Sequence, residues 1–252
     1  MKKIAFIGCS HFAAFETGAG QGTDSWTWQL AELYPGNRYR NYSVGGRGIE
    51  YFQWCIMHAK AWGADIIFLN RTYTGRWAIM GEYDEHANSD FVNDWNVVQH
   101  TNNWDEAYIA VAHTWGSGGR HDVNGAVASY LSKPLNAAMQ VITDTWASTA
   151  LRKSYEDQWY RQAVDLYNFD EIFLVDWAGT GDDIISNIRT DTSVVELLKK
   201  KFDCKFELDL WKYGVTRAKD DNHLTKKGHS IMLHEYILSS DHVKSALTSQ
   251  KN

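Results

Sequence analysis

Four short segments with β-branched and aromatic side chains stand out along the chain. Short segments of apolar character are typical of the buried strands of a parallel sheet. The predicted strands are Lys3–Gly8, Tyr39–Val44, Ala64–Leu69 and Glu171–Asp176.

Apolar residues at helical spacing predict helices between and after these strands. In the first predicted helix Trp26, Leu30 and Leu33 recur at helical spacing. Ser193, followed three residues later by Glu196, is a capping-box pattern that marks the start of a later helix. The predicted helices are Ser25–Tyr34, Ile49–Trp62, Ser154–Tyr167, Ser193–Phe202 and Thr225–Leu238.

Strands that alternate with helices imply right-handed crossovers and a parallel sheet covered on both faces. The sequence therefore predicts an α/β fold with a central parallel sheet, in one domain that spans residues 1–252. The segment at about 81–150 interrupts the alternation and is rich in Asn, Asp, His and Trp. We expect this segment to be an inserted subregion, mostly helical or irregular, over the carboxyl edge of the sheet.

Composition and charge exclude several classes of protein and partner. The chain has 44% hydrophobic and 22% charged residues, as globular proteins do, so disorder is not expected. The formal net charge of −6 argues against a nucleic-acid partner, which would require clustered Lys and Arg. The one basic run, 199–201, is better explained as a solvated helix end. No stretch approaches the roughly 20 apolar residues of a membrane span, so we expect no membrane partner.

Cysteine use indicates neither a disulfide framework nor a metal cluster. The three cysteines are widely separated and form no CxxC pair. His113 and His121 also lack metal-ligand spacing, and we expect no metal and no cofactor.

The apolar run at the start of the chain is shorter than the roughly 7–15 residues of a signal-peptide core. We therefore expect a cytoplasmic protein, which could be virion-associated if a phage encodes it.

The 12 tryptophans, within an aromatic content of 14%, have two interpretations. They can fill gaps in the core and between layers. Some of them can instead form platforms on which a sugar ring or another flat ligand stacks.

Candidate chemistry gathers where the predicted strands end, which is where open α/β sheets bind their ligands. Ser10 follows the first strand, a glycine-rich segment at 45–48 follows the second, and Asn70 follows the third. Near the C-terminus stand Asp220 and His223. A carboxylate near an imidazole can orient it, so that the imidazole acts as general base toward a serine.

The order of these residues resembles that of the SGNH/GDSL hydrolase superfamily, whose members are esterases, lipases and carbohydrate deacetylases. The family's first block, GDS, reads Gly8-Cys9-Ser10 here, and its second block fits Asn41 through Gly46. Its last block, DxxH followed by Gly-His, matches Asp220, His223 and Gly228-His229.

The resemblance implies a flavodoxin-like, three-layer α/β/α fold and a Ser-His-Asp triad. Ser10 would be the nucleophile, His223 the general base and Asp220 the carboxylate that orients it. The backbone N–H groups of Ser10 and Gly46, with the side chain of Asn70, would form the oxyanion hole.

Two blocks depart from the family pattern. Cys9 replaces the Asp of GDS, and the third block, GxND, is missing, with Asn70 the nearest asparagine. The segment after the third strand is similar instead to a divergent branch with a T-x-x-x-R pattern, met by Thr72 and Arg76, that is frequent in phage and bacterial proteins. Arg76 would bind an anionic substrate group or replace the missing oxyanion donor, or it pairs with a structural carboxylate.

Two neighbours of the predicted nucleophile have alternative roles. His11 can line the substrate pocket together with Thr72, or it can be a packing residue. Cys9 could be a thiol nucleophile, but side chains of adjacent residues in extended chain point to opposite sides, so only one of Cys9 and Ser10 can face His223. The order of the family's blocks favours Ser10.

The resulting hypothesis is a serine esterase or deacetylase that cleaves an ester or O-acetyl group, and an acylated carbohydrate is the substrate class that we favour. Two alternatives remain. The chain could be an SGNH-fold binding or virion-associated structural module with an impaired site, or an acyltransferase that uses the same triad.

Overall fold

The computed structural model describes residues 1–12, 24–43, 48–71, 150–167, 169–177, 188, 191–219 and 221–249, together with the backbone of strands 76–80 and 112–116. All statements below concern these residues.

Four parallel strands form the central sheet, in the order β2-β1-β3-β6. They are β1 (Lys3–Ile7), β2 (Arg38–Asn41), β3 (Ile66–Arg71) and β6 (Glu171–Asp176). All four predicted strands are confirmed, with ends shifted by up to three residues. The protein is therefore a mixed α/β protein with a four-stranded parallel sheet.

The five predicted helices are also confirmed. They are α1 (Trp26–Leu33), α2 (Ile49–Trp62), α6 (Ala150–Leu166), α7 (Val194–Lys201) and α8 (Lys226–Ile231), the last continuing as the π-helical segment η3 (Met232–Ile237). The side chain of Ser193 accepts a hydrogen bond from the backbone N–H of Glu196, as its capping pattern predicted. The 3-10 helix η2 (Glu207–Tyr213) and the helix α9 (Asp241–Thr248) were not predicted.

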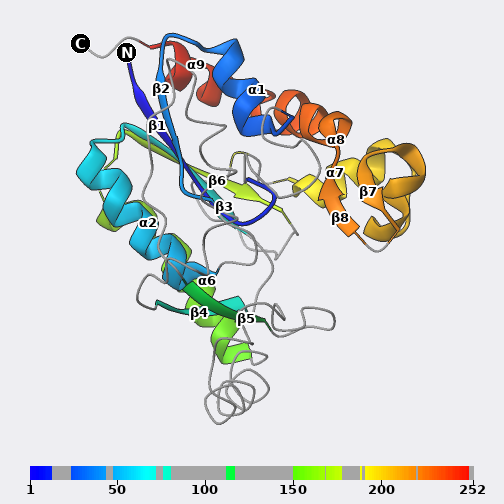
Figure 1. The fold of residues 1–252 in the computed structure, drawn as a ribbon, viewed down its shortest axis with the longest axis horizontal. Helices are drawn as coiled ribbons and strands as arrows, with labels where there is room; N and C mark the ends of the chain where they lie inside the picture. The colour runs from blue at the N-terminus through cyan, green and yellow to red at the C-terminus, as the bar shows by residue number, and fades with distance from the viewer. Residues whose placement is uncertain are drawn as a thin grey trace, which may run out of the picture.

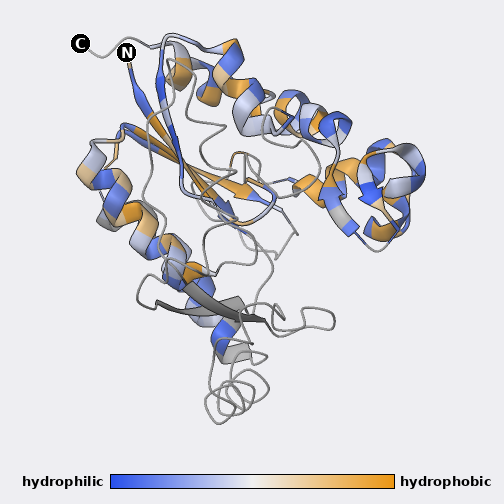
Figure 2. Ribbon diagram, in the orientation of Figure 1, coloured by the Kyte–Doolittle hydropathy of each residue, from blue (hydrophilic) through white to orange (hydrophobic). Residues whose placement is uncertain are grey.

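Helices lie on both sides of the sheet, an arrangement compatible with a three-layer α/β fold. In Figure 1, α2 and α6 lie together on one side, and α1, α8 and α9 lie on the other. Figure 2 shows the largely hydrophobic strands β3 and β6 between these helices, whereas β2 is hydrophilic.

The core is aromatic where β1 meets its neighbours. Phe6 packs edge-on against Trp26 at a ring-centroid distance of 5.3 Å and stacks on Phe68 at 5.6 Å. Trp26 and Trp177 are both almost completely buried. The core-filling interpretation of the tryptophans therefore holds for these two.

Two antiparallel pairs accompany the main sheet. Strand β4 (Arg76–Met80) pairs with β5 (Ala112–Gly116), and β7 (Thr216–Ala218) pairs with β8 (Asp221–Leu224). Strand β5 belongs to the insertion expected at about 81–150, where a mostly helical or irregular structure was predicted. The rest of that insertion, up to the start of α6, lies outside the described residues. Within the described residues, no helix is long and apolar enough to cross a membrane.

His229, in helix α8, makes the stability of the fold sensitive to acid. Its side chain is buried, and its Nδ1 has no hydrogen-bond partner within the described part of the chain. Burial, helped by the positive charge of Arg217, lowers the pKa of His229 to about 3. In the unfolded chain a histidine has a pKa of about 6.5, so between these values the unfolded state binds the extra proton.

We therefore expect the free energy of unfolding to fall as the pH drops below about 6.5, by roughly 1.4 kcal/mol per pH unit from this residue. Urea unfolding at pH 7 and at pH 5 measures the loss, which is expected to be about 2 kcal/mol larger in the wild type than in His229→Gln. The exposed His234 lies in η3, so His234→Gln is the control and should keep the wild-type dependence. Identical pH dependence in wild type and His229→Gln would contradict the prediction.

Candidate active site

The turn that carries Ser10 leaves β1 at the carboxyl edge of the sheet and is held by Asn70. The side-chain oxygen of Asn70 accepts hydrogen bonds from the Cys9 backbone N–H at 3.4 Å and from the Cys9 thiol at 3.0 Å. The side-chain NH₂ of Asn70 donates to the carbonyl of Val175 at 3.4 Å. Cys9 and Asn70 are completely buried, whereas Ser10 is half-buried. Asn70 therefore ties the turn to the neighbouring strands and leaves Ser10 at the surface.

Gly8 allows the turn to approach β3. A Cβ atom at Gly8 would lie 2.8 Å from the Cβ of Asn70 and 2.8 Å from the Cγ of Phe12. Carbon atoms in contact are normally about 3.5–4.0 Å apart, so the turn would have to shift.

We expect Gly8→Ala to lower the free energy of unfolding by about 1–3 kcal/mol, because the added methyl group overpacks the turn. Chemical denaturation measures this loss. Gly36→Ala is the matched control, since a Cβ there would meet no atom within 4 Å. Equal free energies of unfolding for the two variants would contradict the prediction, because they would show that the turn accommodates a Cβ atom at Gly8.

Asn41 fixes the far side of the same turn. Its side-chain NH₂ donates to the carbonyl of Phe12 at 2.8 Å, and its oxygen accepts from the backbone N–H of Ser43 at 2.9 Å. Asn41 thus links the Ser10 turn to the loop that follows β2. Gly46, the predicted oxyanion donor of that loop, lies outside the described residues.

Three aromatic rings form a row at the carboxyl edge of the sheet. His11 stacks on Trp177, which follows β6, with ring centroids 3.5 Å apart and planes at 14°. The ring centroid of His223, in β8 near the C-terminal end of the chain, lies 5.6 Å from that of His11. The residue next to Ser10 therefore lies beside the predicted general base. His11 itself is only 2% exposed, which favours its role as a packing residue.

The carboxylate that contacts the ring of His223 belongs to Asp221. Its Oδ1 lies 2.5 Å from the Nδ1 of His223 and also accepts the backbone N–H of His223 at 2.9 Å. Burial raises the pKa of Asp221, but the hydrogen bonds from His223 and the charges of His223 and Arg217 outweigh it, so the net pKa is lowered. Asp221 is therefore well suited to remain a carboxylate and to orient the imidazole.

Strand geometry explains this pairing. Asp221 and His223 lie two residues apart in β8, and side chains at this spacing project from the same face of a strand. Asp220 lies outside the described residues, so its predicted role stays a prediction. The alternation of a short strand, had one been expected at 221–224, would have pointed to Asp221 from the sequence.

The Ser10 hydroxyl makes no hydrogen bond to a described residue, and so none to the His223 ring. Catalytic hydrogen bonds are often long or absent before substrate binds and form only in the complex.

Three further residues, Asn70, Thr72 and Arg76, were predicted to bind the substrate or the oxyanion. Asn70 was predicted as an oxyanion donor, but its buried side chain is bonded to Cys9 and Val175, which suits a residue that positions the turn. Thr72 lies outside the described residues. Arg76 begins β4, where it pairs with Gly116. The predicted substrate-binding roles of Thr72 and Arg76 stay predictions.

Helix α6 supports the carboxyl end of β3, a role that was not predicted from the sequence. Arg71, at the end of β3 and 1% exposed, forms an ion pair of 2.5 Å with Asp157 of α6. The hydroxyl of Tyr160, also in α6, donates to the carbonyl of Asn70 at 3.1 Å. A buried arginine in a strand is costly unless it is paired, so Arg71 requires α6 to cover it.

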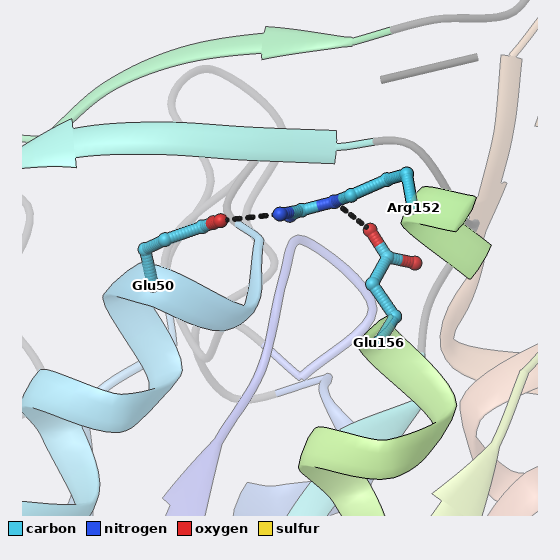
Figure 3. A network of polar contacts seen from close by, with 3 residues as sticks. All are labelled: Glu50, Arg152 and Glu156. Carbon is cyan, nitrogen blue, oxygen red and sulfur yellow. Dashed lines mark hydrogen bonds and ion pairs between the residues drawn. The ribbon is translucent and has the colours of Figure 1, made fainter. Parts of the chain in front are cut away.

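A second buried arginine joins α6 to the start of α2. Arg152 is completely buried and contacts Glu50 of α2 and Glu156 of α6, each at 2.7 Å (Figure 3). Burial alone would lower the pKa of Arg152, but the two carboxylates outweigh it and the net pKa is raised. Because α2 begins three residues after Gly46, this ion pair anchors the helix that follows the predicted oxyanion donor in the sequence.

The described residues were also compared with the requirements of a metal-binding site. No group of three or more His, Cys, Asp or Glu side chains suitable for a metal ion occurs among the described residues.

Comparison with known proteins gives no assignment. No protein-family model matches the chain, and searches of curated proteins and of solved structures found no match.

Proposed function

We propose that the protein is a serine hydrolase of the SGNH type, an esterase or deacetylase on a flavodoxin-like fold. One observation carries the proposal: the Asp221–His223 pair lies beside the Ser10 turn at the carboxyl edge of a parallel sheet. Carboxylate, imidazole and hydroxyl are the three groups that a serine nucleophile requires, and this edge is where such sheets bind ligands.

The proposed reaction begins with Ser10. Its Oγ attacks the carbonyl carbon of the ester while His223 removes the hydroxyl proton. Because Nδ1 of His223 faces Asp221, Nε2 is the nitrogen that accepts this proton. Asp221 orients the ring and stabilises the imidazolium that forms.

The carbonyl oxygen becomes an oxyanion in the tetrahedral intermediate. Backbone N–H groups of Ser10 and Gly46 would stabilise it, and removing one such donor typically costs about 100- to 1000-fold in rate. Collapse of the intermediate expels the alcohol, which takes its proton from His223, and leaves Ser10 acylated. Water, deprotonated by His223, then attacks the acyl group and regenerates Ser10.

The buried environment of Cys9 supports Ser10 as the nucleophile. The Cys9 thiol is completely buried and bonded to Asn70, whereas Ser10 is half-buried. A thiol that is hidden from solvent and held by an amide cannot reach a bound substrate without unfolding the turn.

For the substrate we propose an ester or O-acetyl group on a carbohydrate, without a cofactor. Transfer of the acyl group to a second alcohol would use the same three side chains. A site without catalysis, in a binding or virion-associated structural protein, is favoured by one observation: Ser10 and His223 share no hydrogen bond in this structure.

A fluorophosphonate probe tests the proposal, because it labels only an activated serine nucleophile. We expect stoichiometric labelling of the folded protein, located at Ser10 by peptide mass spectrometry. Absence of labelling in protein shown to be folded by circular dichroism would overturn the hydrolase proposal and favour the impaired site.

Product analysis separates hydrolysis from transfer. The protein is incubated with p-nitrophenyl acetate in the presence of an acceptor alcohol such as methanol or a monosaccharide. Hydrolysis gives acetate as the main product, whereas acetylated acceptor as the main product would identify an acyltransferase.

A further inference from the structure

A hollow lies between helices α2 and α6, which run side by side in Figure 1. Its volume is about 270 Å³, just below the roughly 300–1,000 Å³ of typical ligand sites. Three glutamine side chains line it: Gln53 from α2, and Gln158 and Gln162 from α6. All three glutamines are exposed to solvent.

Aromatic rings supply the rest of the wall. Tyr155, Trp159 and Tyr167 line the hollow, and Tyr155 is 47% exposed while Trp159 is 8% exposed. Ala163, 1% exposed, also lines it, and its small side chain leaves room that a larger residue would fill. The lining of the hollow thus combines aromatic rings with side-chain amide groups.

The spacing along α6 shows that this is one continuous helix face. Residues 155, 158, 159, 162 and 163 follow the i, i+3, i+4, i+7, i+8 pattern of a single helical stripe. Normally such a stripe is apolar and faces the core. Here the stripe alternates aromatic residues with glutamines and faces a hollow that is open to solvent.

An ion pair connects the two helices that form this hollow, referred to below as the groove. Arg152 of α6 binds Glu50 of α2 as well as Glu156, one turn before the groove begins (Figure 3). The guanidinium of Arg152 also lies 5.4 Å from the ring centroid of Tyr155. The groove is therefore preformed, which reduces the entropy that binding would cost.

All described lining residues are uncharged, and this defines the ligand. A charged ligand would meet no countercharge from them, and a wholly apolar ligand would leave the glutamine amides without partners. Each glutamine offers two N–H donors and a carbonyl acceptor, which match hydroxyl groups that both donate and accept. Aromatic faces suit the apolar C–H face of a pyranose ring.

We propose that the groove between α2 and α6 binds a neutral oligosaccharide, with a pyranose ring stacked on the aromatic residues and its hydroxyls bonded to Gln53, Gln158 and Gln162. The groove shares no residue with the candidate active site. This proposal does not depend on the activity of Ser10, and binding would persist in a protein without hydrolase activity.

Side-chain amide NMR on ¹⁵N-labelled protein tests the proposal directly. Cellotetraose, maltotetraose and tetra-N-acetylchitotetraose are titrated separately to millimolar concentration. We expect at least one of them to shift glutamine side-chain resonances that disappear from the spectrum in the double variant Gln53→Ala/Gln158→Ala.

The affinity loss in the double variant is expected to be about tenfold, since each hydrogen bond contributes roughly 0.5–1.5 kcal/mol. Tyr155→Ala should weaken binding further through loss of stacking. Arg161→Ala is the control, because Arg161 is exposed on the same helix but does not line the groove, and its affinity should equal that of the wild type. Ser10→Ala should also bind as the wild type does, which separates this site from the proposed active site.

Three outcomes would overturn the proposal. They are absence of binding of all three oligosaccharides, binding that the double variant retains in full, and binding that is lost in Ser10→Ala. Binding of an uncharged polar peptide at the same glutamine resonances, without binding of any oligosaccharide, would assign the groove to a protein partner instead.

Discussion

Replacing Ser10 with alanine is expected to lower the rate of ester hydrolysis by at least about 1000-fold. The alanine side chain has no oxygen with which to form the acyl intermediate, so only the background attack of water remains. Initial rates with p-nitrophenyl acetate measure the loss, and labelling by a fluorophosphonate should disappear in the same variant.

The substitution should leave the fold intact. Ser10 is half-buried, and its hydroxyl makes no hydrogen bond to any described residue. Substitutions of this kind usually change the free energy of unfolding by no more than about 0.5 kcal/mol. A loss of activity with unchanged thermal unfolding would therefore report on chemistry and not on misfolding.

Cys9→Ala is the matched control on the neighbouring residue. The Cys9 thiol is buried against Asn70, so its loss should cost stability but should leave most of the activity and the labelling. If Cys9→Ala abolished activity while Ser10→Ala retained it, the nucleophile would be the thiol and the turn would have to open during the reaction.

The main sheet and the helices that cover it could be predicted because their signals are local. Strands β1, β3 and β6 are short, mainly apolar runs with buried centres, as at Phe6 and Phe68, whereas β2 alternates buried and half-buried residues. Helix α2 was predicted with both ends correct. There Gly63 adopts the left-handed conformation that commonly ends a helix, and it follows directly after the last predicted residue.

Elements that depend on tertiary contacts escaped prediction. Strands β7 and β8 are only three and four residues long, and each is defined by its pairing with the other. The polar sequence at 221–224 therefore reads as a loop, although it is a strand. Similarly, nothing local shows that Arg71 and Arg152 are buried, since each is tolerated only because carboxylates of α6 or α2 meet it.

The candidate site was predicted in its parts but not in its internal contacts. Placing Ser10 and His223 at the carboxyl edge required only the order of the elements along the chain. Recognising Asn41 and Asn70 as residues that hold the Ser10 turn required hydrogen bonds between strands far apart in sequence. The choice between Asp220 and Asp221 depended on the backbone conformation of a segment for which no strand was predicted.

That choice leads to the second prediction, that Asp221→Asn lowers kcat by about 100- to 10,000-fold while Asp220→Asn has a small effect. In the wild type the Asp221 carboxylate accepts a hydrogen bond from Nδ1 of His223, which leaves Nε2 without a proton and able to act as base. An asparagine at this position can turn its NH₂ toward Nδ1, and this would favour the tautomer with the proton on Nε2, which cannot accept one from Ser10.

Asp220→Asn is the matched control, because it removes the same charge one residue away and does not alter the contact between Asp221 and His223. The kcat of both variants, measured at several pH values with p-nitrophenyl acetate, distinguishes the two carboxylates. A large loss in Asp220→Asn with near wild-type activity in Asp221→Asn would mean that the DxxH spacing identifies the catalytic carboxylate and that the pairing in β8 is rearranged when substrate binds.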